Sequence, residues 1–508
     1  MRKVLLASVF LFLAAPLWAE DLYVAQNATG AGTGVDCANA RPASFYNLST
    51  NWGAGVNLIS PGDTVHLCGT FTTALIARGN GTSGSPITIL YEPGAKHSSP
   101  AGWGTSGALS ATGKSFLIFD GGADGLIEAT SNGTGLTTQL QSVGVFLSST
   151  SDCEVRNITI SNMYVRAALS ADFRAFGRGI EMQGGNRNLI HDNRIDDAFF
   201  GVFTFSSGTI TGTKIYNNTI ANVSTGVVHG SGNTGAQLNN AEIYGNDIDY
   251  TTVWQGSWPT TPGSPCTLVV PAACGDNHHH LDGIHVWAVH ASTSLTNLKI
   301  YDNFIHGNVG TGNMTGTIFV ECNPGTCANA INYNNLLVVT VGSPSNAFID
   351  YKGAGATGIK YFNNTIVGAN AGTCMRSGGG TALEFKNNIC FDVGTGISIA
   401  DAATTIASSN NNVFFSLGGN QMFYQTGFKT FANWQSTLGL DANSLTSDPL
   451  LNVNFRPSPL SPAVNRGVDL SAFFTVDKRG IARPQGPAWD MGSFEVARPN
   501  PPSNLKSP

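Results

Sequence analysis

A short motif recurs through the middle of the chain and constrains its fold more than any other feature. Each copy contains a short apolar strand, an asparagine and a second short strand, and most copies continue with glycine and a β-branched residue. The aligned asparagines are separated by 25, 28, 57, 32, 29 and 24 residues, and the spacing of 57 contains one repeat plus an insertion. A period of about 20 to 30 residues built from strands and turns is typical of a β-solenoid. The aligned positions are Asn193, Asn218, Asn246, Asn303, Asn335, Asn364 and Asn388.

One copy of this repeat cannot bury its apolar face alone, so the copies are expected to stack. Stacking at about 4.8 Å per coil joins equivalent strands into parallel sheets and aligns equivalent residues in ladders. We therefore predict an all-β solenoid over residues 20–445, with an inserted loop at about residues 250–280. The repeated asparagines would form an internal amide ladder at a tight turn, where Asn tolerates a left-handed backbone and pairs with neighbouring backbone groups.

The first residues have the pattern of an export signal. Arg2 and Lys3 precede an apolar run over residues 4–15, and Ala19 is a small residue at which a signal peptidase could cut. The run is too short to span a bilayer, and no later segment supplies a span. We predict a signal peptide over residues 1–19 and a secreted product, extracellular or periplasmic, with no membrane association.

Cysteine content and charge refine this expectation. Nine cysteines in an exported chain indicate disulfides with one thiol left over, and proximity in sequence favours Cys37 with Cys68, Cys266 with Cys274, and Cys322 with Cys327. Connectivity cannot be fixed in this way. The net charge of −6 gives no indication of nucleic acid binding. We expect a monomer.

The ends of the chain carry further motifs. The opening YVAQNATGAG and ISPGDTVHLCGTFT, together with the repeat, resemble the right-handed parallel β-helix proteins of the pectate-lyase-like superfamily over about residues 22–445. The segments SDPLL, SPAVNRG, DKRGIARP and DMGSFE are similar to the terminal module of many secreted bacterial β-helix proteins. The resemblance implies a right-handed β-helix, a cap over residues 446–496 held together by Asp477, Arg479 and Asp490, and a Pro-rich tail or linker over residues 497–508.

Alternation along the strands after each glycine predicts which side chains face outward. Charged groups interleaved with aromatic rings on one sheet face suit an extended sugar chain, because rings stack on pyranose faces and polar groups bind hydroxyls or carboxylates. The alternative is a solvated face with weak ion pairs. The outward set contains Glu181, His285, Glu321, Asp350, Lys352 and Arg376, with Phe203, Trp287 and Phe319 between them and Gln183 and Phe205 nearby.

The stretch NHHHLDGIHVW lies at the entry to one of these strands. In an extended chain His278, His280 and Asp282 project to the same side, where imidazoles and a carboxylate could share a divalent cation. The alternatives are hydrogen bonding or acid–base chemistry by His280, Asp282 and His285. The preceding insertion carries Trp254 and Trp258, and we expect it to wall one side of the groove.

HLDGIHV is also similar to the NTDGIHV motif of polygalacturonases, in which the aspartate is catalytic; the matching residue is Asp282. The family's asparagine is replaced by His280, its paired aspartates on the next coil are missing, and its Gly-His-Gly appears only as Gly394-Thr395-Gly396. A polygalacturonase in the strict sense is therefore not expected.

Three functions remain open, and we favour a polysaccharide lyase acting by β-elimination on a uronate-containing glycan. Elimination needs a cation to neutralise the sugar carboxylate and a base for the C5 proton, which Lys352, Arg376 and His285 could supply. A glycoside hydrolase would use paired carboxyl groups among Asp282, Glu321 and Asp350. The third possibility is a non-catalytic β-helix protein, either a glycan-binding module or a surface adhesin. Under either enzymatic function Glu181, Phe203, Trp254, Trp258, His280, Trp287 and Phe319 are the candidate substrate-binding residues.

Overall fold

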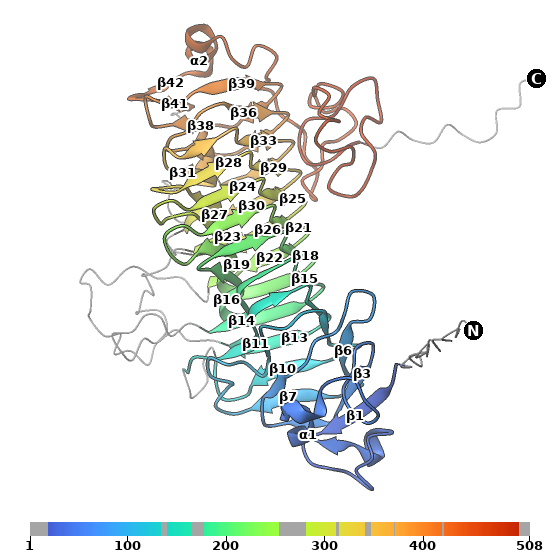
Figure 1. Cartoon of the computed structure of the whole chain (residues 1–508). Helices are drawn as coiled ribbons and strands as arrows, with labels where there is room; N and C mark the ends of the chain where they lie inside the picture. Colours follow the sequence, from blue (N-terminus) through green and yellow to red (C-terminus); the bar gives the residue numbers. More distant parts are fainter. Residues whose placement is uncertain are drawn as a thin grey trace, which may run out of the picture.

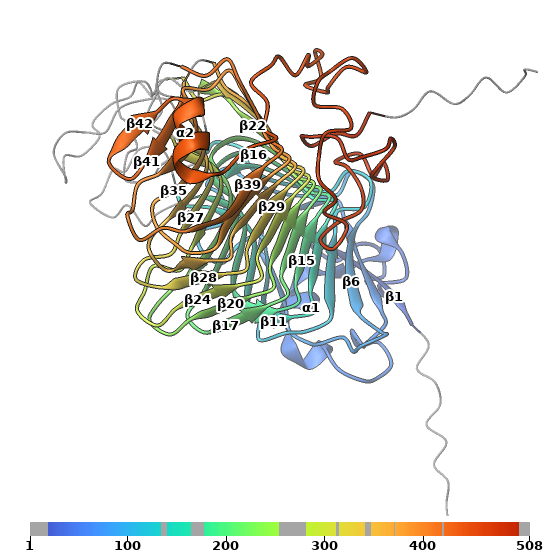
Figure 2. The same cartoon turned by 90° about the horizontal axis from the view of Figure 1, so that it is seen from above.

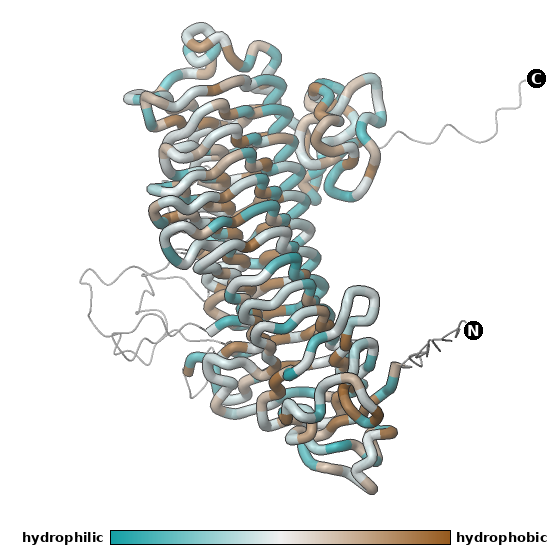
Figure 3. Tube along the Cα trace, in the orientation of Figure 1, coloured by the Kyte–Doolittle hydropathy of each residue, from teal (hydrophilic) through white to brown (hydrophobic). Residues whose placement is uncertain are grey.

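The chain winds into a tall column of stacked β-coils, a right-handed parallel β-helix, as the repeat and the family resemblance predict (Figure 1). The computed structural model describes residues 19–133, 140–163, 177–252, 281–310, 314–340, 347–369, 371–418 and 421–496. The signal peptide but for its last residue, most of the inserted loop and the C-terminal tail fall outside these residues. Hydrophobic segments recur from coil to coil through the column (Figure 3). Along strands such as Ile87–Tyr91 buried positions alternate with more exposed ones, because successive side chains of a strand point to opposite faces.

Three parallel sheets run along the column. Sheet A has 14 strands and lies on the side where each coil begins its asparagine turn. In order along the sheet its strands are β2 (Arg41–Pro42), β1 (Asp21–Ala25), β3 (Thr64–Cys68), β6 (Ile87–Tyr91), β9 (Leu117–Asp120), β12 (Glu154–Arg156), β15 (Leu189–His191), β18 (Lys214–Tyr216), β21 (Glu242–Tyr244), β25 (Lys299–Tyr301), β29 (Ile331–Tyr333), β33 (Lys360–Phe362), β36 (Leu383–Lys386) and β39 (Ile406–Asn410).

Sheet B has 23 strands and forms two rows, because most coils bend between two successive strands. The first row contains β4 (Thr70–Phe71), β7 (Lys96–Ser99), β10 (Leu126–Ala129), β13 (Thr159–Met163), β22 (Asp247–Tyr250), β26 (Phe304–Asn308), β30 (Leu336–Thr340), β34 (Thr365–Val367), β37 (Ile389–Phe391) and β40 (Val413–Phe415).

The second row contains β5 (Leu75–Ala77), β8 (Leu109–Thr112), β11 (Val143–Ser151), β14 (Arg178–Asn186), β23 (Leu281–Trp287), β27 (Met314–Glu321), β31 (Ala347–Lys352), β35 (Thr373–Ser377), β38 (Thr395–Ile399) and β41 (Met422–Tyr424), to which β42 (Gly427–Lys429) adds antiparallel. The long strands β16 (Arg194–Ser206) and β19 (Thr219–Ser231) belong to both rows. Sheet C closes the coils with β17 (Thr209–Thr211), β20 (Gln237–Asn239), β24 (Ser294–Thr296), β28 (Thr326–Ala328) and β32 (Ala356–Thr357).

The asparagine ladder forms inside the turn between sheet A and the first row. Asn364 is typical: its Nδ2 donates to Asn388 Oδ1 at 3.0 Å and to the carbonyl of Asn332 at 2.9 Å. The ladder extends one step further than predicted, to Asn412. The left-handed backbone, however, belongs to the residue before each ladder asparagine, such as Asn363 with φ 49°. The buried asparagine therefore serves as the bonding residue of the turn.

Short helices lie at both ends of the column. Helix α1 (Ala43–Asn47) and the 3₁₀ turns η1 (Cys37–Asn39) and η2 (Ser49–Asn51) lie at the N-terminal end. At the other end α2 (Phe431–Leu438) covers the last coils and buries Trp434 completely (Figure 1). In the described part of the chain no helix is both long and apolar enough to cross a membrane.

Two of the predicted disulfides are confirmed, Cys37–Cys68 and Cys322–Cys327. A third, Cys374–Cys390, was not predicted, and Cys153 is a buried free thiol. Cys266 and Cys274 lie outside the described residues. Disulfides in this number are typical of proteins from oxidising compartments.

The C-terminal segment 446–496 lies along the flank of the column, beside the asparagine turns, rather than over its open end (Figure 2). Asn363 Nδ2 donates to the carbonyls of Asp490 and Gly492, each at 2.9 Å, and Asn387 Nδ2 donates to that of Val468 at 2.8 Å. The placement differs from the cap we expected because exposed turn amides offer the segment bonding partners along the side. End capping is provided by α2.

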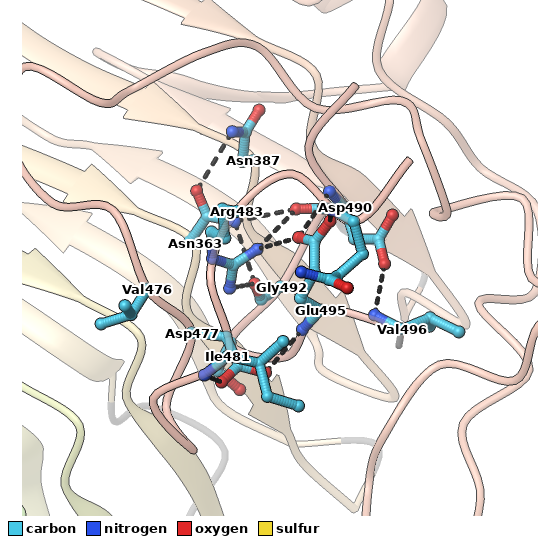
Figure 4. A network of polar contacts seen from close by, with 12 residues as sticks. Asn363, Asn387, Val476, Asp477, Ile481, Arg483, Asp490, Gly492, Glu495 and Val496 are labelled. Carbon is cyan, nitrogen blue, oxygen red and sulfur yellow. Dashed lines mark hydrogen bonds and ion pairs between the residues drawn. The ribbon is translucent and has the colours of Figure 1, made fainter. Parts of the chain in front are cut away.

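An ion-pair network holds this segment together (Figure 4). Arg483 is buried with Glu495, and their charged atoms lie 3.0 Å apart. Arg479 pairs with Asp477 at 2.9 Å, and the carboxylate of Asp490 accepts from the backbone N–H groups of Asn465 and Val496. These contacts match the internal structural role expected for Asp477, Arg479 and Asp490.

Candidate active site

The second row of sheet B brings residues that are far apart in sequence to neighbouring positions. At one position of the strand register, His285 of β23 is paired with Phe319 of β27, which is followed by Asp350 of β31 and Arg376 of β35. Two residues further along the strands, Trp287 is followed by Glu321 and Lys352. All six predicted catalytic side chains thus come from four adjacent strands.

A ladder of glycines sets the bend between the two rows and so places this group. A Cβ added to Gly226 would lie 2.6 Å from the carbonyl oxygen of Gly283 and 2.7 Å from Ile248 Cδ1, closer than real Cβ contacts occur. Gly144, Gly179, Gly201 and Gly283 meet the same restriction. The glycine of the repeat is therefore required by close backbone approach, and Asp282 sits at the bend immediately before one of these glycines.

Asp282 is fully buried and held rigidly. Its Oδ1 accepts hydrogen bonds from Thr315 Oγ1 at 2.5 Å and from the Gly316 N–H at 3.0 Å. A register shift between Leu281 and Asp282 interrupts the pairing with β27, and such irregularities re-aim side chains. Asp282 Oδ2 lies 3.5 Å from His285 Nδ1, so this carboxylate faces the imidazole.

His285 connects Asp282 to a second carboxylate. Its Nε2 lies 3.5 Å from Glu321 Oε2, and Glu321 Oε1 lies 3.4 Å from Lys352 Nζ. Burial alone would raise the pKa of Glu321, but the neighbouring His285 and Lys352 outweigh it and hold this pKa below its usual value. Side-chain exposure increases outward, from 0% for Asp282 to 15% for His285 and 23% for Glu321.

Asp350 and Arg376 form a second, deeper ion pair. Asp350 Oδ2 accepts from Arg376 Nη2 at 2.5 Å, and the Asp350 side chain is only 1% exposed. Burial raises the pKa of Asp350 above its usual value despite this pair, and the negative charge of Asp282 acts in the same direction. Glu321 and Asp350 are therefore neighbouring carboxyl groups whose pKa values are shifted in opposite directions.

The predicted sugar-binding residues divide into two groups. Phe203 is 8% exposed and Phe319 is 1% exposed, and Glu181 is 2% exposed and paired with Arg178 at 2.8 Å. A same-face neighbour covers Phe203, because the guanidinium of Arg178 lies 4.6 Å from the centre of its ring, and substrate contact by the three residues stays a prediction.

Besides Phe205, Trp287 remains partly exposed among the aromatic residues predicted on this face. Its Nε1 donates to the carbonyl of Ser231 at 3.0 Å, and its ring centre lies 4.8 Å from that of His285. The alternation that identified the outward face did not reveal Arg178, which comes from the same strand as Glu181 and shields Phe203.

The remaining candidates, Trp254, Trp258, His278 and His280, lie outside the described residues. The wall formed by the insertion and a cation bound by His278, His280 and Asp282 therefore stay predictions. Among the residues that the structure describes, no group of three His, Cys, Asp or Glu side chains has an arrangement suited to a metal ion.

Comparisons with known proteins agree with the fold. The family model described as "Right handed beta helix region" matches residues 110–260. No curated protein matches the sequence. Solved structures with a similar fold include the pectate lyase Pel9A, at 15% identity, 94% coverage of this chain, 97% of that chain and a TM-score of 0.47.

Two further solved structures show the same range of similarity. XylC in complex with xylose has 10% identity, 94% and 99% coverage and a TM-score of 0.46. The GH136 lacto-N-biosidase from Eubacterium ramulus has 14% identity, 84% coverage of this chain, 67% of that chain and a TM-score of 0.43. At these identities the likeness concerns the fold alone, so the function has to be argued from the site.

Proposed function

We propose that this protein is a glycan-cleaving enzyme whose reacting groups lie on strands β23, β27 and β31. The observation that carries the proposal is the pair of neighbouring carboxyl groups with opposite shifts, Glu321 with a lowered pKa and Asp350 with a raised pKa. When the surroundings of two carboxyl groups shift their pKa values in opposite directions, the group with the lower pKa can act as the base and the other as the acid.

The geometry favours hydrolysis. Glu321 and Asp350 are one strand and two residues apart, which places their Cα atoms about 8 Å from each other. This spacing allows the roughly 6.5–9.5 Å between carboxyl groups that an inverting hydrolase needs to admit a water molecule. Glu321, ionised and partly exposed, would activate the water, and Asp350 would protonate the leaving oxygen.

His285 and Asp282 complete the proposed machinery. The imidazole lies between Glu321 and Asp282, so it can take up the proton that Glu321 removes from water while both carboxylates stabilise the resulting imidazolium. Asp282 is a positioning residue, because its Oδ1 is fixed by Thr315 and Gly316 and only its Oδ2 faces the ring.

β-Elimination, which the sequence favoured, is the second candidate. Its requirement for cations is met less well, because Arg376 is paired with Asp350 and Lys352 lies beside Glu321. The observation that supports elimination is the 65% exposure of Lys352, whose ammonium group could reach a uronate carboxylate.

Turnover of named polysaccharides by the mature protein tests the proposal. Xylan, galactan, arabinan, polygalacturonate and alginate are incubated with the wild type, with Glu321→Gln and with the control Glu384→Gln, which lies on sheet A. We expect new reducing ends from the wild type and the control, and a loss of about 10²–10⁴ in rate for Glu321→Gln. Equal rates for all three proteins would refute the site. Absence of turnover on the whole panel would favour the non-catalytic binding function.

Lys352→Ala separates the two reaction classes. Hydrolysis should tolerate the loss of this exposed cation with less than about a tenfold change, whereas elimination should lose most of its rate because the uronate carboxylate would stay unneutralised. Unsaturated products, detected by their ultraviolet absorbance, would show that elimination is the reaction.

A further inference from the structure

Two aromatic rings of the second row lie over glycine positions at the end of β19, where no side chain separates the rings from the backbone. A Cβ added to Gly230 of β19 would lie 2.1 Å from Cε2 and 2.4 Å from Nε1 of Trp287, so the indole covers this glycine. A Cβ added to Gly232, just beyond β19, would lie 2.6 Å from Cζ of Phe205, so the tip of that ring covers the second glycine. The two glycines thus allow Trp287 and Phe205 to settle against the backbone from opposite sides of β19.

A pocket of about 490 Å³ opens next to Phe205, toward the N-terminal end of the column. Strands β11, β14 and β16, the turn after β16 and the first residue of β17 supply its lining. Its polar residues are hydroxyls and amides, including Ser148, Gln183, Asn186, Ser207 and Thr209, and none of the described lining residues is charged. Gln183 and Ser207 are exposed, and Phe205 is half-buried.

We infer that Trp287, Phe205 and this pocket form an extended binding site for an uncharged stretch of glycan, running along the column from the acid–base cluster toward the N-terminus. The inference rests on the proposed function and specifies its substrate class. Partly exposed aromatic rings offer apolar surface to pyranose rings, and the surrounding hydroxyl and amide groups match sugar hydroxyls.

The strand order gives the length of this site. From β23, which carries His285 and Trp287, the order runs through β19, β16 and β14 to β11. Four steps of about 4.8 Å give a path of roughly 19 Å, long enough for several sugar units. The site therefore favours chains over short oligosaccharides.

The uncharged lining argues against a uronate chain at this end of the site. A sugar carboxylate placed in the pocket would lose hydration without meeting a cation among the described lining residues, which is costly. The charged residues of the face are concentrated at the cluster itself, and Arg178 is occupied by Glu181.

Binding without turnover tests the inference directly. In the Glu321→Gln background, we compare Phe205→Ala, Phe205→Tyr and the control Phe428→Ala, an exposed ring on β42. Affinity electrophoresis in gels containing xylan, galactan or polygalacturonate measures the binding of each variant. We expect at least fivefold weaker binding to a neutral polysaccharide for Phe205→Ala, near-normal binding for Phe205→Tyr, and no change for Phe428→Ala. Undiminished binding by Phe205→Ala, or Phe205-dependent binding confined to polygalacturonate, would overturn the inference.

Activity on chains of different length separates this inference from the proposed function. On oligosaccharides of a cleaved neutral polysaccharide, Phe205→Ala in the otherwise wild-type enzyme should lower kcat/KM at least fivefold for hexamers and less than twofold for dimers. Equal losses at both lengths would contradict the extended site while leaving the proposed function intact. Neutral-glycan binding that depends on Phe205, in a protein that cleaves nothing, would refute the proposed function and leave the binding site standing.

Discussion

Replacing Asp282 with asparagine should disable the proton relay while leaving the fold intact. Asp282 Oδ1 accepts hydrogen bonds from Thr315 and from the Gly316 N–H, so an amide at this position would keep its oxygen there. Its NH₂ group would then point toward His285 Nδ1, which lies 3.5 Å from Oδ2 in the wild-type protein. Since the amide donates to Nδ1, the ring would carry its hydrogen on Nε2, facing Glu321. In that tautomer Nε2 cannot accept the proton that the relay requires.

The magnitude follows from the lost charge. Two unit charges 3.5 Å apart interact by about 5 kcal/mol at an effective dielectric constant of about 20. Because His285 is 15% exposed, solvent screening reduces the loss to about 3–4 kcal/mol. A barrier raised by that amount lowers kcat by about 10²–10³.

Steady-state kinetics on a polysaccharide that the wild type cleaves provide the assay. Asp196→Asn is the matched control, because its carboxylate on β16 accepts from Asn222 and an amide oxygen can do the same. Thermal unfolding checks that both variants fold. A kcat for Asp282→Asn within threefold of the control would refute the relay, and a loss confined to KM would assign Asp282 to substrate binding.

Three further predictions concern the scaffold. Burial raises the pKa of Asp302 to about 6, above its value in the unfolded chain, so the contribution of Asp302 to stability is present below about pH 4 and lost as pH rises through 6. Asp302→Asn should therefore raise Tm at pH 7 and not at pH 4. A lower Tm at pH 7 would show that the charge of Lys478 dominates instead. Asn364→Ala removes four buried hydrogen bonds at about 1 kcal/mol each, so urea unfolding should show a loss of about 4 kcal/mol, against about 0.5 kcal/mol for the exposed control Asn443→Ala. Gly226→Ala should cost about 1–3 kcal/mol through its clash with Gly283, whereas Gly427→Ala, with open space around the new Cβ, should leave Tm unchanged; equal Tm values would refute the glycine ladder.

Features that repeat along the chain were predictable from sequence. Asn193 to Asn388 recur at coil spacing, so stacking alone puts them in one ladder, and the same register makes His285, Phe319 and Asp350 neighbours. Features that depend on contacts between side chains at different positions of the coil, or between separate segments, were not predictable. The burial of Phe203 under Arg178, the Cys374–Cys390 bridge and the docking of residues 446–496 on the turns all depend on side-chain packing that a linear pattern does not encode.

The most direct test of the proposed chemistry is mass spectrometry of the products released in water enriched in oxygen-18. Hydrolysis by Glu321 and Asp350 predicts one heavy oxygen in each new reducing end of the wild-type product, and almost no product from Glu321→Gln. Products that lack the heavy oxygen and are lighter by one water molecule would contradict hydrolysis, and undiminished labelling by Glu321→Gln would contradict the site.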